Sequence, residues 1–313
     1  MNENVDAVLG KEVHYESHYN PGILVRIPRQ DNRSQLAIDS TDLPFTGFDT
    51  WHAWEATFLV QGVPVNGVLK IIIPASSKYT VESKSLKLYL FGFAMESYDG
   101  DIKVKQAINI YETTIRKDLM KLLECNVEVR FHLSTYQAQP SSVPYYHQLS
   151  EIKDWDDLNK YCDPDQGTRA EIYKEDPSLL QDGLKEVVYF NLPHSYVYDG
   201  LRSNCRVTHQ PDYGTVYISY QPSAKKSFMM QLQPASLAKY LISFRNENHF
   251  HEEIVETIYT RLWKLLQPEY LEVTAFYTRR GGIDICPSRC SSDANSFRQS
   301  LGNPNIVCKE FRS

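Results

Sequence analysis

The sequence predicts an α+β protein built from two copies of one antiparallel module, ordered strand, strand, helix, helix, strand. A recurring order of strand-like and helix-like patterns, a short internal repeat and a length of 313 residues all indicate this. The repeat is clearest in the first helix of each copy, where residues 85–93 and 236–244 agree at five of nine positions. Matching element order combined with short identities indicates tandem duplication.

In the first copy, residues 51–60 and 68–73 are aromatic and β-branched. The turn-rich connector 61–67 between them predicts a β-hairpin. Residues 81–93 then predict a loop that enters a helix, and alternation over 127–133 predicts a half-buried antiparallel strand. Between these segments a second helix is indicated by apolar residues spaced three and four apart, namely Ile108, Tyr111, Ile115, Leu119 and Leu122.

In the second copy, residues 215–220 predict a strand, 236–244 a helix and 271–277 a further strand. A second helix precedes that last strand, with an apolar face formed by Ile254, Ile258, Leu262, Leu265 and Leu266. In both copies the second helix is therefore followed by a strand, as a duplication requires.

These patterns divide the chain into four predicted parts. Residues 1–40 are an N-terminal extension, polar and irregular, which is expected to pack across a domain. Residues 41–147 form the first module, 148–190 an acidic linker or insertion, and 191–313 the second module.

The net charge of −6 is concentrated in one segment. Residues 151–186 hold 11 acidic and 5 basic residues, so this segment alone carries the whole imbalance and the remainder is neutral. A nucleic-acid-binding protein should show a basic surface, so the sequence predicts no direct binding to nucleic acid.

Cysteine usage and the absence of targeting patterns predict a cytoplasmic protein. The N-terminus lacks a signal-peptide pattern, and the longest apolar run, 68–73, is interrupted by Lys70, so no membrane association is expected. No cysteine pair has Cys-x-x-Cys spacing, so no metal site is predicted. The sequence instead predicts free thiols in a reducing compartment at Cys125, Cys162, Cys205, Cys286, Cys290 and Cys308.

Cys205 and Asp212 are the first candidates for chemistry. A thiol near a carboxyl group is the minimum for covalent catalysis with proton delivery. The polar flanks, including Arg202 and Arg206, indicate a thiol outside the deep core, and nearby arginines would favour the thiolate. The turn-forming residues around Asp212 explain that carboxylate equally well as a structural feature.

Residues 249–253 combine two histidines with two carboxylates, and three interpretations stay open. Glu252 and Glu253 could cap a helix start, where the helix dipole favours negative charge. A carboxylate could instead accept two neighbouring N–H groups of a ligand. A metal is the third interpretation, although the His-Glu-x-x-His spacing of zinc proteases is absent.

Two further motifs combine charge with small residues, as phosphate contacts prefer. Residues 82–85 are also explained as a helix start, and residues 279–282 as a basic β-turn. Neither is a Walker loop, and no Gly-x-Gly-x-x-Gly follows a strand, so a dinucleotide would not bind through a Rossmann unit.

Together these motifs resemble the 7-cyano-7-deazaguanine reductases of queuosine biosynthesis, in their long, two-module form. The resemblance is carried by residues 81–90, 203–214, 250–252 and 279–282, in the right order. It implies the tunnelling (T-) fold, in which antiparallel ββααββ modules assemble with their active sites at interfaces. The resemblance also leads us to expect histidine at position 247, where this chain has Glu247.

The resemblance implies reduction of a nitrile on a free deazapurine base to a primary amine, with two NADPH. It implies that Cys205 is the nucleophile that forms a thioimide and that Asp212 is the proton donor, provided that its environment keeps it protonated. The implied substrate contacts are Val81, Glu82, Ser83, Phe250, His251 and Glu252. The implied NADPH contacts are Ser83, Lys84, Arg280 and Gly281.

Because these residues come from both modules, the site is expected between them. An isolated four-stranded sheet leaves edges open, so we expect a homodimer in which the sheets close into a barrel. Two alternatives stay open: a zinc-dependent pteridine or purine cyclohydrolase of the same fold, and a non-catalytic purine-binding module.

Overall fold

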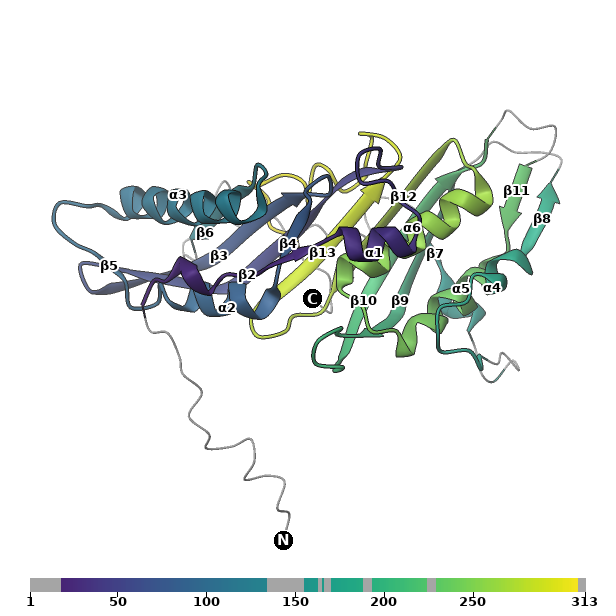
Figure 1. Cartoon of the computed structure of the whole chain (residues 1–313), viewed down its shortest axis with the longest axis horizontal. Helices are drawn as coiled ribbons and strands as arrows, with labels where there is room; N and C mark the ends of the chain where they lie inside the picture. Colours follow the sequence, from purple (N-terminus) through teal and green to yellow (C-terminus); the bar gives the residue numbers. More distant parts are fainter. Residues whose placement is uncertain are drawn as a thin grey trace, which may run out of the picture.

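The structure is a computed structural model that describes residues 18–133, 155–162, 165, 170–187, 193–223 and 229–308. At its centre is a nine-stranded sheet in the order β6-β3-β2-β13-β12-β10-β9-β7, with β5 paired to β2 (Figure 1). The short strands β5 and β7 pair in parallel and the other neighbours pair antiparallel. The prediction of an α+β fold is therefore confirmed.

The first half contributes β2 (Thr46–Val60), β3 (Val63–Pro74), β5 (Ser97–Tyr98), β6 (Glu128–Leu133), α2 (Ser83–Phe91) and α3 (Val104–Leu123). The hairpin between β2 and β3 is tighter than predicted, because only Gln61 and Gly62 lie outside the ladder. Both have positive φ, 51° and 74°, as a two-residue type I′ turn requires. The predicted connector is therefore wrong beyond Gly62.

The second half contributes β9 (His194–Asn204), β10 (Pro211–Gln221), β12 (Tyr270–Tyr277), β13 (Ile283–Cys290), α5 (Pro234–Ser243), η5 (Phe244–Asn246) and α6 (His251–Leu266). Strands β9 and β13 are absent from the patterns recognised in the sequence. All eight residues of β13 are buried, since it lies between β12 and β2. A strand covered on both faces need not alternate apolar and polar residues, so the sequence of β13 does not show the alternation by which a strand is recognised.

The two halves repeat one another in space as well as in sequence. In each, a short strand precedes the first helix and pairs with an upstream strand: β4 (Tyr79–Val81) with β1 (Arg26–Pro28), and β11 (Met229–Leu232) with β8 (Leu184–Val187). Strand β13 of the second half pairs with β2 of the first. The halves therefore share one sheet within a single chain.

The helices cover one face of this sheet, and the C-terminal segment covers the other. On β2, Trp51 belongs to the core under α2 and α3, whereas the adjacent His52 faces the opposite side. There Lys70 Nζ donates to the carbonyl oxygens of Ser300, Asn303 and Ile306 at 2.8, 2.8 and 2.6 Å. The lysine that interrupts the longest apolar run is thus the anchor of the C-terminal segment.

The N-terminal extension is not irregular where the structure describes it. It forms η1 (Pro21–Ile23), β1 and α1 (Gln30–Gln35), and α1 lies over the junction between the halves (Figure 1). Because β1 pairs with β4, this segment is fixed beside the start of α2.

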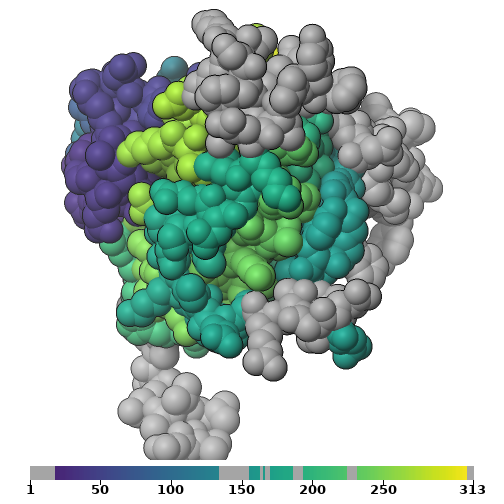
Figure 2. Space-filling view, turned by 90° about the vertical axis from the view of Figure 1, so that its right-hand side faces the viewer, coloured from purple at the N-terminus to yellow at the C-terminus, as the bar shows by residue number. Residues whose placement is uncertain are grey.

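The described part of the acidic segment packs against the second half (Figure 2). It forms β7 (Asp156–Asp157), η3 (Leu158–Tyr161), α4 (Ser178–Gln181) and β8. Leu158 and Leu180 are buried in the core of that half, and Glu175 pairs with Arg261 of α6 at 2.9 Å. Within the described ranges, no helix is both long and apolar enough to cross a bilayer.

Candidate active site

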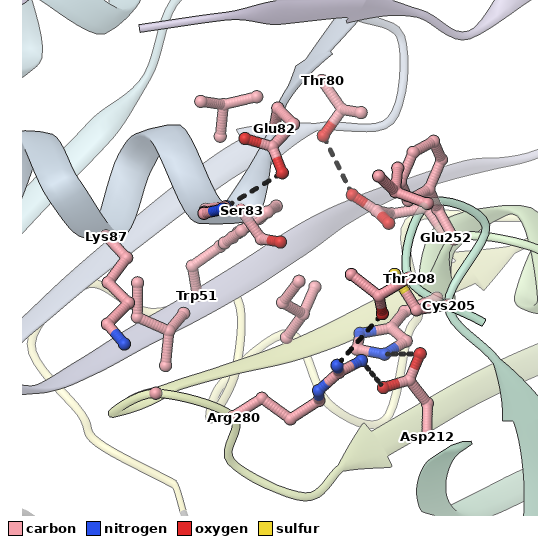
Figure 3. Close-up of a pocket in the computed structure, with 18 of the residues that line it drawn as sticks. Trp51, Thr80, Glu82, Ser83, Lys87, Cys205, Thr208, Asp212, Glu252 and Arg280 are labelled. Carbon is pink, nitrogen blue, oxygen red and sulfur yellow. Dashed lines mark hydrogen bonds and ion pairs between the residues drawn. The ribbon is translucent and has the colours of Figure 1, made fainter. Parts of the chain in front are cut away.

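A cavity of about 470 Å³ lies on the helix-covered face where the two halves meet (Figure 3). Trp51 of β2 and Ile283 and Ile285 of β13 line it, so its floor is the strand pair that joins the halves. The structure brings every predicted site residue to this cavity: Val81, Glu82, Ser83, Lys84, Cys205, Asp212, Phe250, His251, Glu252, Arg280 and Gly281. The individual roles of these residues stay predictions.

Cys205 directly follows β9, in a loop closed by its own backbone. Its N–H donates to Gln210 O at 2.8 Å, and its carbonyl accepts from the N–H of His209 at 2.9 Å. Burial alone would raise the pKa of the half-buried thiol, but the hydroxyl and N–H of Thr208 and the N–H of Val207 donate to the sulfur. These bonds outweigh burial and lower the pKa below its usual value, as a nucleophilic thiol requires.

The arginines that flank Cys205 do not act as the sequence indicates. Arg206 pairs with Glu253 at 2.6 Å, and Arg202 bonds to the backbone of Arg245. The cation whose charge interacts with Cys205 is Arg280 instead, which comes from the turn between β12 and β13. The expectation failed because sequence neighbours on a sharp loop point toward different elements.

Thr208 gives a direct test of this loop. We expect Thr208→Val to raise the pKa of Cys205, because the thiolate loses its side-chain donor. The midpoint of iodoacetamide alkylation against pH should move upward, whereas Thr208→Ser should keep the wild-type midpoint. An unchanged midpoint in the valine variant would contradict the assignment.

Asp212 lies at the start of β10 and is buried between Arg280 and His251. Arg280 Nη1 lies 2.5 Å from one carboxylate oxygen, and His251 Nε2 lies 3.4 Å from the other. Burial alone would raise the pKa of Asp212, but hydrogen bonds and charge from His251 and Arg280 lower it. The lowered pKa favours the carboxylate form of Asp212 in the ligand-free protein, and its role as proton donor stays a prediction.

The turn that carries Arg280 confirms the interpretation of residues 279–282 as a turn. Gly281 and Gly282 have φ of 58° and 82°, in the region that favours glycine. A Cβ at Gly281 would lie 2.6 Å from Nζ of Lys87, so a side chain there would fill the space beside this lysine. Sequence reasoning missed Lys87, although it lies one helical turn from Ser83 and Lys84 on α2.

Glu82 has a structural role as well as a place on the cavity wall. It is the N-cap of α2, and its carboxylate accepts from the N–H groups of Lys84 at 3.0 Å and Ser85 at 2.6 Å. The interpretation of residues 82–85 as a helix start is confirmed. Ser83 and Lys84 are exposed beside it at the cavity mouth.

The two glutamates at the start of α6 have different environments. Glu253 caps the helix, accepting from the N–H of Phe250 at 3.0 Å. Glu252 lines the cavity and accepts from the Thr80 hydroxyl at 2.9 Å. His251 stacks on Tyr277 at 3.8 Å, and its buried Nδ1 has no hydrogen-bond partner among the described residues.

A metal-like group of residues lies elsewhere. His52, Asp284 and Cys286 approach one another, but alternation along β13 places Asp284 and Cys286 on the face opposite Ile283 and Ile285. Both carboxylate oxygens of Asp284 already accept hydrogen bonds, from His52 and from Trp54 Nε1. The group is therefore a hydrogen-bonded cluster under the C-terminal segment, separate from Cys205.

Comparisons with known proteins find matches in both halves of the chain. Residues 15–131 match the family model "Nitrile reductase, 7-cyano-7-deazaguanine-reductase N-term", and residues 211–296 match the model "QueF-like protein". The chain is 37% identical over 291 residues to the NADPH-dependent 7-cyano-7-deazaguanine reductase of Dechloromonas aromatica, covering 91% of this chain and 90% of that one. The chain belongs to the 7-cyano-7-deazaguanine reductase family.

Other members of the 7-cyano-7-deazaguanine reductase family are similarly related. The Chromohalobacter salexigens and Rickettsia canadensis proteins of the same name are 37% and 38% identical, covering 90% and 92% of this chain and 91% and 94% of theirs. A crystal structure of the archaeosine synthase QueF-Like in the apo form is 18% identical, covering 35% of this chain and 95% of that one with a TM-score of 0.26, which is too low to support an argument.

Glu247, the position at which the family resemblance implies histidine, contacts two other segments. Its carboxylate accepts the N–H of Glu175 at 2.9 Å, and its carbonyl accepts the N–H of Asn204 at 2.7 Å. In this member of the 7-cyano-7-deazaguanine reductase family, Glu247 therefore links the acidic segment to the strand end that carries Cys205.

Proposed function

We propose that this protein is an NADPH-dependent reductase that converts the nitrile of 7-cyano-7-deazaguanine to a primary amine, in queuosine biosynthesis. The observation that carries this proposal is one cavity in which a thiol of lowered pKa, a buried carboxylate and a second carboxylate converge from both halves of the chain. Its volume of about 470 Å³ is in the range of small-molecule sites.

Glu252 is the group best placed to recognise the base. A guanine-like edge offers N–H donors side by side, and one carboxylate can accept both. The position of Glu252 is fixed by Thr80, and the adjacent His251 offers a buried ring nitrogen to the same cavity. A base analogue that lacks these donors would leave a buried carboxylate unpaired, which gives strong discrimination.

The residues that line the cavity also suit the phosphates of NADPH. Lys84, Lys87 and Arg280 are cations of the kind that bind phosphate, and Gly281 leaves open the space that a Cβ would fill beside Lys87. Bound NADPH would supply hydride, and reduction of a nitrile to an amine takes two hydrides. Ser83 and Lys84 at the exposed start of α2 would hold it together with Arg280 and Gly281.

Cys205 and Asp212 together supply the covalent chemistry. Because Asp212 begins as a carboxylate, it accepts the thiol proton as the sulfur forms a bond to the nitrile carbon. One C–N π bond breaks, and the nitrogen takes the proton back from Asp212, which gives a thioimide on Cys205. Asp212 is thus a base before it is the proton donor.

The test is NADPH oxidation by the purified protein with 7-cyano-7-deazaguanine. We expect two NADPH consumed per nitrile and a primary amine as product. Binding of the base without NADPH oxidation would favour the non-catalytic alternative. Elemental analysis of the active protein gives the other test. Stoichiometric zinc in that protein would favour the cyclohydrolase alternative.

We also infer that two chains assemble through the outer strands of the sheet, as T-fold barrels do. Within the described ranges, β6 and β7 end the main sheet, and an open edge is a pairing surface. A sedimentation mass of one chain at micromolar concentration would contradict a homodimer.

A further inference from the structure

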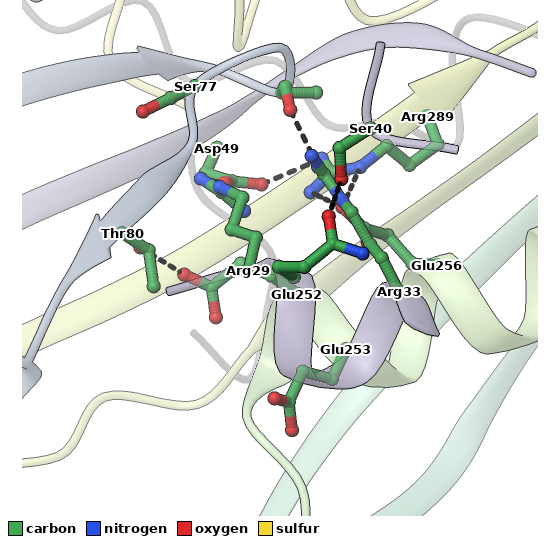
Figure 4. Close-up of polar contacts among 12 residues, drawn as sticks. Arg29, Arg33, Ser40, Asp49, Ser77, Thr80, Glu252, Glu253, Glu256 and Arg289 are labelled. Atoms are coloured by element: carbon green, nitrogen blue, oxygen red, sulfur yellow. Dashed lines mark hydrogen bonds and ion pairs between the residues drawn. The ribbon is translucent and has the colours of Figure 1, made fainter. Parts of the chain in front are cut away.

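A group of buried charges lies beside Glu252 (Figure 4), and Arg29, Glu252 and Glu256 line a second, small cavity there. Arg33 donates to Glu256 at 3.0 and 2.8 Å, and Arg289 donates to the same carboxylate at 3.1 and 2.9 Å. Arg289 also pairs with Asp49 at 2.7 Å, and Arg29 pairs with the other oxygen of Asp49. All five side chains are buried.

The charges of this group do not balance without Glu252. Arg29, Arg33 and Arg289 bring three positive charges, whereas Asp49 and Glu256 bring two negative charges. A buried charge without a counter-charge is costly. Glu252 is the additional carboxylate that faces this group.

Two neighbouring groups act on Glu252 in opposite directions. Burial and the negative charge of Asp49 hold the pKa of Glu252 above its usual value, and the positive charge of Arg29 opposes this rise. Arg33 and Arg289 are each committed to Glu256 through two hydrogen bonds. Arg29 lines the same small second cavity as Glu252, so it is the cation that acts most directly on that carboxylate.

Arg29 is held in place by the N-terminal segment. Its N–H donates to Lys78 O at 3.0 Å, and the preceding strand β1 pairs with β4, which carries Thr80. The same pairing thus positions both Arg29 and the hydroxyl that bonds to Glu252.

We propose that Arg29 is a positioning residue that keeps Glu252 ionised toward the cavity, so that the N-terminal segment completes the base-binding site. This rests on the proposed function, in which the Glu252 carboxylate accepts the N–H groups of the substrate base. Arg29 itself does not line the larger cavity that holds Cys205.

The test measures binding of 7-cyano-7-deazaguanine against pH by calorimetry, in the full chain with Cys205→Ala so that no adduct forms. Affinity should fall as Glu252 is protonated at acidic pH. In Arg29→Gln this fall should occur at higher pH, because the cation that lowers the pKa of Glu252 is lost. In Asp49→Asn it should occur at lower pH, because the opposing negative charge is lost.

Opposite shifts separate this role from general damage to the fold, which would weaken binding at every pH in both variants. Arg33→Gln is the matched control, since it lies in the same charge group but bonds to Glu256, and its midpoint should stay near that of the parent. The other charges near Glu252, including His251, Arg289 and Glu256, and the cavity carboxylates Glu82 and Asp212, are common to the parent and both test variants.

Midpoints that do not move, or that move in the same direction in both variants, would overturn the inference. If Arg29→Gln does not fold, the shift in Asp49→Asn decides, and Arg29→Lys should keep the parent midpoint. Absence of binding by the parent at every pH would overturn the proposed function, and this inference with it.

Discussion

Replacing Cys205 by alanine is expected to abolish nitrile reduction, with a loss of at least about 10³-fold in kcat, because the reaction loses its proposed nucleophile. A nitrile accepts hydride poorly, and thiolate addition converts it to a more electrophilic C=N group. The lowered pKa of Cys205 favours this addition, and the Asp212 carboxylate is the proposed acceptor of the thiol proton. Steady-state NADPH oxidation at 340 nm measures the loss.

Intact-mass spectrometry gives a second measurement that does not depend on turnover. Wild-type protein mixed with 7-cyano-7-deazaguanine without NADPH should gain the mass of one substrate, and Cys205→Ala should gain none. Cys125→Ala is the matched control, because Cys125 is also only partly buried and does not line the cavity. An adduct that persists in Cys205→Ala, or normal turnover by that variant, would contradict the mechanism.

The sequence predicts local features well because they depend on neighbours along the chain. The apolar spacing along α3 and α6 and the turn around Gly281 are local, and the structure confirms them. The repeat places Glu82 and Cys205 in different copies, which is why a site between them could be expected before any contact was known.

The charge states within the site could not be predicted in this way, because they depend on distant partners. Asp212 is held as a carboxylate partly by Arg280, 68 residues further along the chain. Arg206, next to Cys205 in sequence, pairs with Glu253 instead of the thiol. Spacing shows which groups are present, whereas pKa depends on which side chains the fold brings into contact.

The buried charge group is a further case in which the sequence offers no signal. Arg33 and Glu256 are 223 residues apart and join the N-terminal segment to α6. The sequence of the N-terminal segment looks polar and irregular because several of its polar side chains form buried ion pairs. Arg29 and Arg33, which would ordinarily be assigned to the surface, are buried.

Glu256→Gln is therefore expected to destabilise the protein by about 3–5 kcal/mol, the usual cost of removing one partner from a buried ion pair. The substitution keeps the shape of the side chain but leaves Arg33 and Arg289 facing each other without their shared counter-charge. Since whole domains are stable by only about 5–15 kcal/mol, the loss should be plain in urea unfolding.

Glu124→Gln supplies the control for this last experiment, because Glu124 forms an ion pair with Arg26 whose side chains are 51% and 42% exposed. Exposed pairs contribute about 0–1 kcal/mol, so this variant should unfold close to wild type. If Glu256→Gln cost no more than Glu124→Gln, water would have to reach the guanidinium groups, and the burial of Arg33 would be wrong. A large loss that is partly recovered when Arg33 and Arg289 are also replaced by methionine would show that the uncompensated charges, and not lost packing, destabilise the fold.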